Sequence, residues 1–315
     1  MKLVLKSLCT IWLLGLLASC ASEESTKYYI KPIKSNALKA VAVEDFATNA
    51  EIQKQILSMP FLLVQERLGT FRLKANSTIM LAGGIADKGF EQKDTYALAV
   101  DLQGNYEALV DTPHSQIAVL SLAEYDFSRI NDGQMHRVLK REVASEKWSN
   151  VIFASRLSIF EFFTKGLFFT NKEMDEVAGR EALKFNVSWD VDKNDGLDFD
   201  FHSMHGSLAT MSRAVWRDKA IGQTIEGAIW LDRASGVWSK AELNAKLMLE
   251  QADKEPMAIE VRYDFVLEDI AERITFELPE KWREKKNLQK QLNPLAFFKE
   301  HMPVEETDDT QDKGK

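Results

Sequence analysis

The chain has 315 residues, which is long enough to bury a large hydrophobic core without disulfide support. It contains only two cysteines, so a framework of several disulfides is excluded. The formal net charge of −8 argues against nucleic acid as a partner and against a basic patch for anionic lipid.

The first twenty residues have the anatomy of a secretory signal peptide. Two lysines precede an apolar run from Leu8 to Leu17, which is too short to span a bilayer as a permanent helix. The run ends in Leu17-Ala18-Ser19-Cys20, which resembles the lipobox of bacterial lipoproteins. This resemblance implies that Cys20 is acylated and that its acyl chains anchor the mature protein to the membrane. A chance cysteine after an ordinary cleaved signal is the alternative.

Ala21 follows the expected lipidation site, where an aspartate would imply retention at the inner membrane. The resemblance to bacterial lipoproteins therefore implies a location at the outer membrane, facing the periplasm.

Composition divides the remaining chain into three parts. Residues 21–45 are expected to form a polar tether, and residues 283–315 a charged C-terminal tail. Residues 46–282 show no break in composition and no internal repeat, which predicts a single domain.

The domain is expected to open with two short helices. Thr48 and Glu51 match a capping box at the start of the first helix, which continues to Leu57. A second helix is expected from Phe61 to a stop at Gly69.

Beyond Gly69 the apolar period changes to two, which predicts antiparallel hairpins with one solvated face. The expected strands are 71–81, 96–100, 106–110, 117–125 and 136–141, with turns at 83–84, 103–105 and 131–133.

One long helix is predicted over residues 145–165, with Ser145 as its N-cap. Trp148, Ile152, Ile159 and Phe163 fall on one side of this helix and form a wide apolar stripe.

Strands are expected to resume after this helix. The pattern predicts a hairpin of 183–191 and 197–201, a second hairpin of 225–231 and 237–249, and a last pair of 257–267 and 274–278. Sequential strands with intervening helices indicate an α+β fold, not a parallel doubly wound sheet.

The motifs that could carry catalysis or bind metal are incomplete. Residues 190–196 resemble a calcium loop, but the glycine is one position late and the final glutamate is missing. A solvated hairpin explains these acids, and a weak surface cation site is the alternative. His202 and His205 lack an evident third ligand, and no Gly-x-Ser-x-Gly occurs. We therefore expect no metal, no cofactor and no catalytic residue, and a protein that is not an enzyme.

The pattern of strands and helices resembles the LolA/LolB/LppX lipoprotein-carrier superfamily. The segment from Trp230 to Val237, Trp-Leu-Asp-Arg-Ala-Ser-Gly-Val, is similar to a hairpin frequent in these proteins, with Ser235 in place of threonine and Trp238 in place of proline. The resemblance covers roughly residues 46–280. It implies a curved antiparallel sheet, a half-open barrel, with helices covering the concave face.

The function expected from these features is binding of a lipid or an acylated ligand, such as a lipoprotein, in an apolar groove. Ile152, Ile159 and Phe163 are candidates for the lid of this groove, and Trp189 and Trp230 for its sheet wall. The alternative is a structural or assembly lipoprotein whose sheet edge or acidic tail binds other envelope proteins. A hydrolase would require a catalytic triad assembled from scattered residues.

Overall fold

The computed structural model describes residues 43–82, 90–140, 148–157, 159–163, 166–190, 192, 220–249 and 256–284. The chain divides into the units Met1–Ala37 and Leu38–Lys315, and all described residues belong to the second unit. The expected signal peptide, the lipidation site Cys20 and nearly all of the expected tether and tail lie outside the described residues.

The described strands form one twelve-stranded sheet in the order β12-β6-β5-β4-β3-β2-β1-β11-β10-β9-β8-β7. β12 pairs with β6 in parallel, and every other pairing is antiparallel. The strands are β1 (Phe71–Ala82), β2 (Phe90–Val100), β3 (Tyr106–Asp111), β4 (Gln116–Leu122), β5 (Tyr125–Ile130), β6 (His136–Leu139), β7 (Leu167–Val177), β8 (Arg180–Trp189), β9 (Ala220–Asp232), β10 (Trp238–Leu249), β11 (Met257–Glu268) and β12 (Arg283–Glu284).

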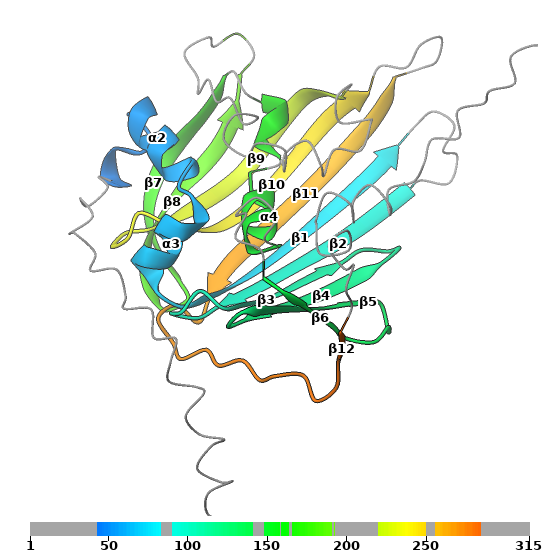
Figure 1. The fold of residues 1–315 in the computed structure, drawn as a ribbon. Helices are drawn as coiled ribbons and strands as arrows, with labels where there is room; N and C mark the ends of the chain where they lie inside the picture. The colour runs from blue at the N-terminus through cyan, green and yellow to red at the C-terminus, as the bar shows by residue number, and fades with distance from the viewer. Residues whose placement is uncertain are drawn as a thin grey trace, which may run out of the picture. The chain divides into compact units, whose positions relative to one another are not determined.

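Two antiparallel meanders make up this sheet and meet in its middle. β1 to β6 form the first and β7 to β11 the second, and β1 pairs with β11 from Arg72↔Glu268 to Ala82↔Ala258. The predicted α+β class with a large antiparallel sheet is confirmed (Figure 1).

The helical elements are short. They are η1 (Val43–Asp45), α2 (Ala50–Leu57), α3 (Phe61–Leu68), α4 (Trp148–Ser155) and the 3-10 turn η3 (Phe160–Phe163). α2 and α3 agree with the prediction, but the N-cap of α2 is Asn49 and not Thr48. The Asn49 side chain accepts hydrogen bonds from the backbone N–H groups of Glu51 and Ile52 at 3.0 and 3.2 Å.

The predicted helix over 145–165 is wrong in length. After the eight residues of α4, i→i−3 hydrogen bonds from Leu157 to Ala154 and from Phe160 to Leu157 tighten the backbone into turns. The apolar stripe of this segment is too wide for one helix face to bury. The turns instead allow Ile159, Phe160 and Phe163 all to be buried against the sheet.

Two strand assignments also change. The segment predicted as one strand, 117–125, contains the end of β4, a tight turn at Ala123 (φ 50°) and the start of β5. β7 was not predicted, because the exposed polar run from Asn171 to Glu176 hides its period of two. β8 pairs with β7 and β9, and the predicted partner 197–201 lies outside the described residues.

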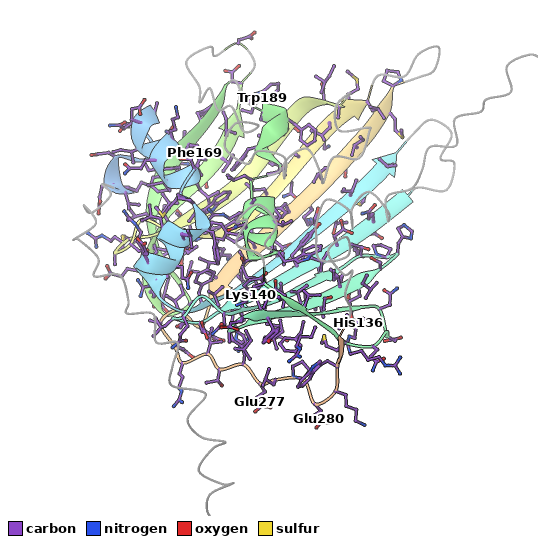
Figure 2. All side chains as sticks on the ribbon, viewed as in Figure 1. His136, Lys140, Phe169, Trp189, Glu277 and Glu280 are labelled. Carbon is purple, nitrogen blue, oxygen red and sulfur yellow. The ribbon has the colours of Figure 1, made fainter. Side chains whose placement is uncertain are left out.

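The predicted strand 274–278 is not a strand. Both neighbouring positions of β11 are already occupied by β1 and β10, so the chain leaves the sheet. It runs as an extended segment below β3–β6 to β12, with Glu277 and Glu280 along it (Figures 1 and 2). The Thr70 hydroxyl donates to the Glu272 carbonyl at 2.5 Å, and the Trp282 ring packs edge-on against Phe127.

The two faces of the sheet differ in composition. One face, which we call the inner face, shares a single apolar cluster with the helices, including Ile56 of α2, Val64 of α3 and Ile152 of α4. α4 contacts β2 and β3, and η3 contacts β9. The outer face carries mostly charged residues and one small apolar cluster around Trp230.

Candidate functional site

Four of the five predicted ligand-binding residues lie in the apolar layer between helices and inner face. Ile152 of α4, Ile159, which directly precedes η3, and Phe163 of η3 are at most 2% exposed. The half-buried Trp189, at the end of β8, meets the Phe163 ring edge-on at 5.4 Å between centroids (Figure 2). The structure therefore brings these four side chains into one cluster, while their binding role stays a prediction.

A glycine allows η3 to approach the sheet closely. A Cβ atom added at Gly222 of β9 would lie 2.5 Å from the Phe162 carbonyl oxygen and 2.7 Å from the Phe163 ring. Any larger residue at this position would push η3 away from β9.

Trp230 does not belong to this cluster, because it lies on the outer face. Its β9 neighbours Ile229 and Leu231 point inward, and the alternation of the strand directs Trp230 outward. There its indole N–H donates to Asp175 Oδ2 at 2.7 Å, and Lys240 Nζ lies 4.2 Å from the ring centroid. The prediction that Trp230 and Trp189 form one wall is corrected.

The apolar cluster of the inner face continues beyond the length of α4. Ile79 and Leu81 of β1, Leu247 and Leu249 of β10, and Ile259 of β11 continue the same cluster toward the ends of these strands. α4 has eight residues and is about 12 Å long, whereas β1, β10 and β11 have twelve residues and span about 40 Å. These strands run well past α4 (Figure 1).

A charged side chain is buried within this apolar layer. Arg156 follows the last residue of α4 and is 1% exposed. Its Nη2 atom donates to the Met59 carbonyl oxygen at 3.4 Å, and its guanidinium carbon lies 3.5 Å from the Phe153 centroid and 5.5 Å from that of Trp238. Burial lowers the pKa of Arg156 to about 9, so the guanidinium stays charged at neutral pH.

Two hydroxyl groups lie beside Arg156. The Tyr263 hydroxyl of β11 is 3.4 Å from the Ser155 hydroxyl, which itself donates to the Ile152 carbonyl at 2.6 Å. Burial raises the pKa of Tyr263 above its usual value, so its hydroxyl remains a hydrogen-bond donor at neutral pH.

Arg156 was not predicted as a site residue. Helical spacing places it one turn after Ile152 and one turn before Ile159, on the apolar side of the predicted helix, and this position was the available signal.

The Trp230–Val237 segment, which carries the family resemblance, forms the β9–β10 turn. The buried Asp232 carboxylate accepts two hydrogen bonds from Arg180, at 2.6 and 3.0 Å, and two from the backbone N–H and hydroxyl of Ser235, at 2.7 and 2.5 Å. Burial alone would raise the pKa of Asp232, but the bonds from Arg180 and Ser235 outweigh it and lower this pKa below its usual value. Arg67 of α3 donates to the Ser235 carbonyl, so the turn holds α3 against the sheet.

An open hollow of about 500 Å³ lies over this turn and is lined by Arg180, Glu181, Asp232, Arg233 and Ala234. Each charge in it is paired, since Arg233 bridges Glu44 and Glu181 at 3.2 and 3.1 Å. The hollow is therefore explained by structural ion pairs.

Within the described ranges, no three histidine, cysteine or acidic side chains lie close enough together to hold a metal ion. His202, His205 and most of the 190–196 loop lie outside these ranges. In the same part of the chain, none of the helices has the length and apolar composition needed to cross a membrane.

Comparison with protein-family models found no match, and neither did a search of curated proteins. Among solved structures, the chain is similar to a LolA superfamily protein from Nitrosomonas europaea (12% identity, 72% of this chain and 93% of that chain, TM-score 0.19). It is also similar to an outer membrane lipoprotein-sorting protein domain from Vibrio parahaemolyticus (12% identity, 74% and 96%, TM-score 0.19).

A third similar structure is lipovitellin, solved in a study of its lipid–protein interactions (10% identity, 67% of this chain, TM-score 0.29). This chain spans about a quarter of the length of lipovitellin, with 26% of that protein covered. TM-scores this low carry no argument about function, so the proposal below depends on the geometry of the inner face.

Proposed function

We propose that this protein is a membrane-anchored envelope lipoprotein that binds a lipid or an acylated ligand between its helices and its sheet. In this proposal the sheet is curved and the helices cover its concave face. Acyl chains on Cys20 hold the protein at the outer membrane, facing the periplasm, and the protein performs no catalysis.

The observation that supports the proposal is the inner face, whose apolar cluster continues past α4 along the long strands. Ile79 on β1, Ile259 on β11 and Leu249 on β10 belong to this cluster and are at most 8% exposed, so a ligand reaches them only when the cover of the sheet opens. An acyl chain gains about 0.8 kcal/mol for each CH2 group that it buries, so a surface of this length can hold one firmly.

The short length of the helices lowers the energetic cost of opening access to this face. α2, α3 and α4 have eight residues each, and such helices depend on tertiary packing rather than on their own stability. Helices of this kind can separate from a sheet at a modest local cost, which is what entry of a lipid requires.

Native mass spectrometry with lipid extraction tests this proposal. The full chain is purified from the membranes of an expressing host, and the bound lipid per protein is measured. We expect one bound lipid or acylated molecule per chain. A lipid-free mass from a host with an ample lipid pool would contradict the proposal.

A pair of variants shows whether the lipid lies on the inner face. Ala245→Phe on β10 adds a ring on the inner face near Ile225 and Val261, and should reduce the bound lipid several-fold. Met80→Phe adds a ring to the exposed outer face of β1 and should leave the bound lipid unchanged. An equal response of both variants would place the lipid elsewhere.

The second candidate is an assembly lipoprotein that binds other envelope proteins, and the position of β7 favours it. Among the described strands, β7 ends the sheet and is hydrogen-bonded to β8 alone. An exposed edge strand can pair with a strand of another protein. A stoichiometric co-purifying protein together with a lipid-free mass would support this candidate.

A further inference from the structure

The buried guanidinium of Arg156 lacks the partners that such a group needs. Its Nε and Nη1 atoms are inaccessible to solvent and have no hydrogen-bond partner among the described residues. A guanidinium has five N–H donors, and here one of them makes a long bond to the Met59 carbonyl. Burying a charge in this way is costly unless a counter-charge and hydrogen bonds compensate it.

The aromatic neighbours compensate only part of this cost. The Phe153 ring lies 3.5 Å from the guanidinium carbon and the Trp238 ring 5.5 Å away, and both attract a cation through their π faces. They accept no directed hydrogen bond in the plane of the guanidinium, where Nε and Nη1 present their donors. An oxyanion would accept from these donors, because carboxylates and phosphates bind a two-pronged edge of a guanidinium, which is either Nε with Nη2 or Nη1 with Nη2.

A hydroxyl donor lies next to the same position. Tyr263 of β11 is buried and protonated, and its hydroxyl makes only the 3.4 Å contact with Ser155 among the hydrogen bonds of the described residues. Ser155, which the Tyr263 hydroxyl contacts, directly precedes Arg156 in the chain. A cation and a neutral donor together can bind an anion, and no described acidic side chain forms an ion pair or hydrogen bond with Arg156.

The inner-face residues that lead away from Tyr263 are apolar and buried. On β11 the next inward residues are Val261 and Ile259, which pair in register with Ala245 and Leu247 of β10. From Tyr263 to Met257 this track is about 20 Å long, comparable to an extended fatty-acyl chain. A polar end at Arg156 and an apolar track beyond it match the two ends of an acidic amphiphile.

We propose that Arg156, with the Tyr263 hydroxyl, binds the carboxylate or phosphate headgroup of an acidic lipid whose acyl chain lies along β10 and β11. This inference rests on the proposed function, because it assigns the chemical class of the lipid bound on the inner face. The headgroup supplies the negative charge and the acceptors that Arg156 otherwise lacks.

Quenching of tryptophan fluorescence by a brominated lipid tests the assignment, because Trp238 lies within 5.5 Å of Arg156. The full chain, purified and held in nanodiscs of uncharged phospholipid, is titrated with dibromostearate and with its methyl ester. The two probes share their acyl chain and differ in the charge of the headgroup. We expect the acid to quench at about tenfold lower concentration than the ester, the effect of one charge-assisted hydrogen-bond pair.

The Arg156→Met variant removes the charge and keeps a side chain of similar length. It should bring the acid to the concentration dependence of the ester, without changing that of the ester. Arg262→Met is the matched control, because Arg262 is the neighbour of Tyr263 on the exposed outer face of β11. This control should retain the tenfold preference for the acid.

Each other result has a distinct meaning. Equal quenching by acid and ester, or a preference that persists in Arg156→Met, would overturn the headgroup assignment and leave lipid binding intact. The absence of quenching by either probe would overturn the proposed function itself. Inorganic phosphate that raises the Tm of the wild type but not of Arg156→Met, without any preference for the acidic lipid, would show a site for free anions and would also overturn the assignment.

Discussion

Replacing Arg156 by methionine should stabilise the lipid-free protein, which is unusual for a change in a hydrophobic core. The wild-type guanidinium is 1% exposed and has two nitrogen atoms without partners among the described residues. Methionine has a similar volume, and exchanging a poorly compensated buried charge for an apolar side chain is often stabilising.

The structure bounds the size of this effect. Burial lowers the pKa of Arg156 from 12.5 to about 9, which corresponds to a penalty of about 5 kcal/mol against the charged form in the folded state. The substitution also loses the contacts of the guanidinium with Phe153 and Trp238, which contribute about 1–2 kcal/mol. We therefore expect the free energy of unfolding to rise by about 3–4 kcal/mol.

Urea unfolding of delipidated protein at neutral pH, followed by tryptophan fluorescence, measures this change. With acidic lipid bound, the sign should reverse, because the wild type then gains the headgroup contacts that the variant cannot make. A variant that is less stable than the wild type by more than about 1 kcal/mol without lipid would refute the reasoning. It would mean that residues outside the described ranges already compensate the guanidinium.

Three further predictions concern the sheet. Asp232→Asn should lower the free energy of unfolding by about 2–3 kcal/mol at neutral pH, because Arg180 loses its charged acceptor. The folded pKa of Asp232 lies below its unfolded value of about 4, so this loss should be full above that value and vanish as the pH falls through the folded pKa. Gly227→Ala should cost more than about 3 kcal/mol by urea unfolding, because φ is +136° and the new Cβ would lie 2.0 Å from a backbone carbonyl oxygen of β10. Trp230→Phe should cost about 1 kcal/mol, through loss of the indole hydrogen bond, and should leave lipid binding unchanged.

Matched controls accompany these variants. Gly179→Ala also places alanine at positive φ (+73°), but no atom lies within 4 Å of the added Cβ, so it should cost only about 1 kcal/mol. Equal losses for Gly179→Ala and Gly227→Ala would contradict the steric argument. A loss of unfolding free energy in Asp232→Asn that does not vary with pH would contradict the assigned ion pair. A loss of bound lipid in Trp230→Phe would indicate that the outer face contributes to lipid binding.

Most strands could be predicted from the sequence because their apolar period is local. Tyr96, Leu98 and Val100 alternate within β2, and the turn at Gly104 follows directly. β7 could not be predicted in this way. It is the last strand of the sheet, and its polar half has little surface to bury, so pairing with β8 defines it where its own composition does not.

The course of the chain after α4 depends on contacts with residues that are distant in the sequence. Periodicity favoured one helix, but the segment ends its regular helix at Ser155 and turns, because Ile159, Phe160 and Phe163 all find apolar partners on the sheet. That choice is decided by residues far away in the sequence, such as Gly222, which leaves room for η3.

The sequence by itself determined the antiparallel class and the position of most strands, since both follow from local alternation. Only the tertiary structure decided which face of the sheet the helices cover, and with it that Trp230 lies on the outer face and that Ile159, Phe163 and Trp189 meet in one cluster. Both depend on contacts between segments far apart in the chain, and the free energy of such contacts leaves no periodic trace in the sequence.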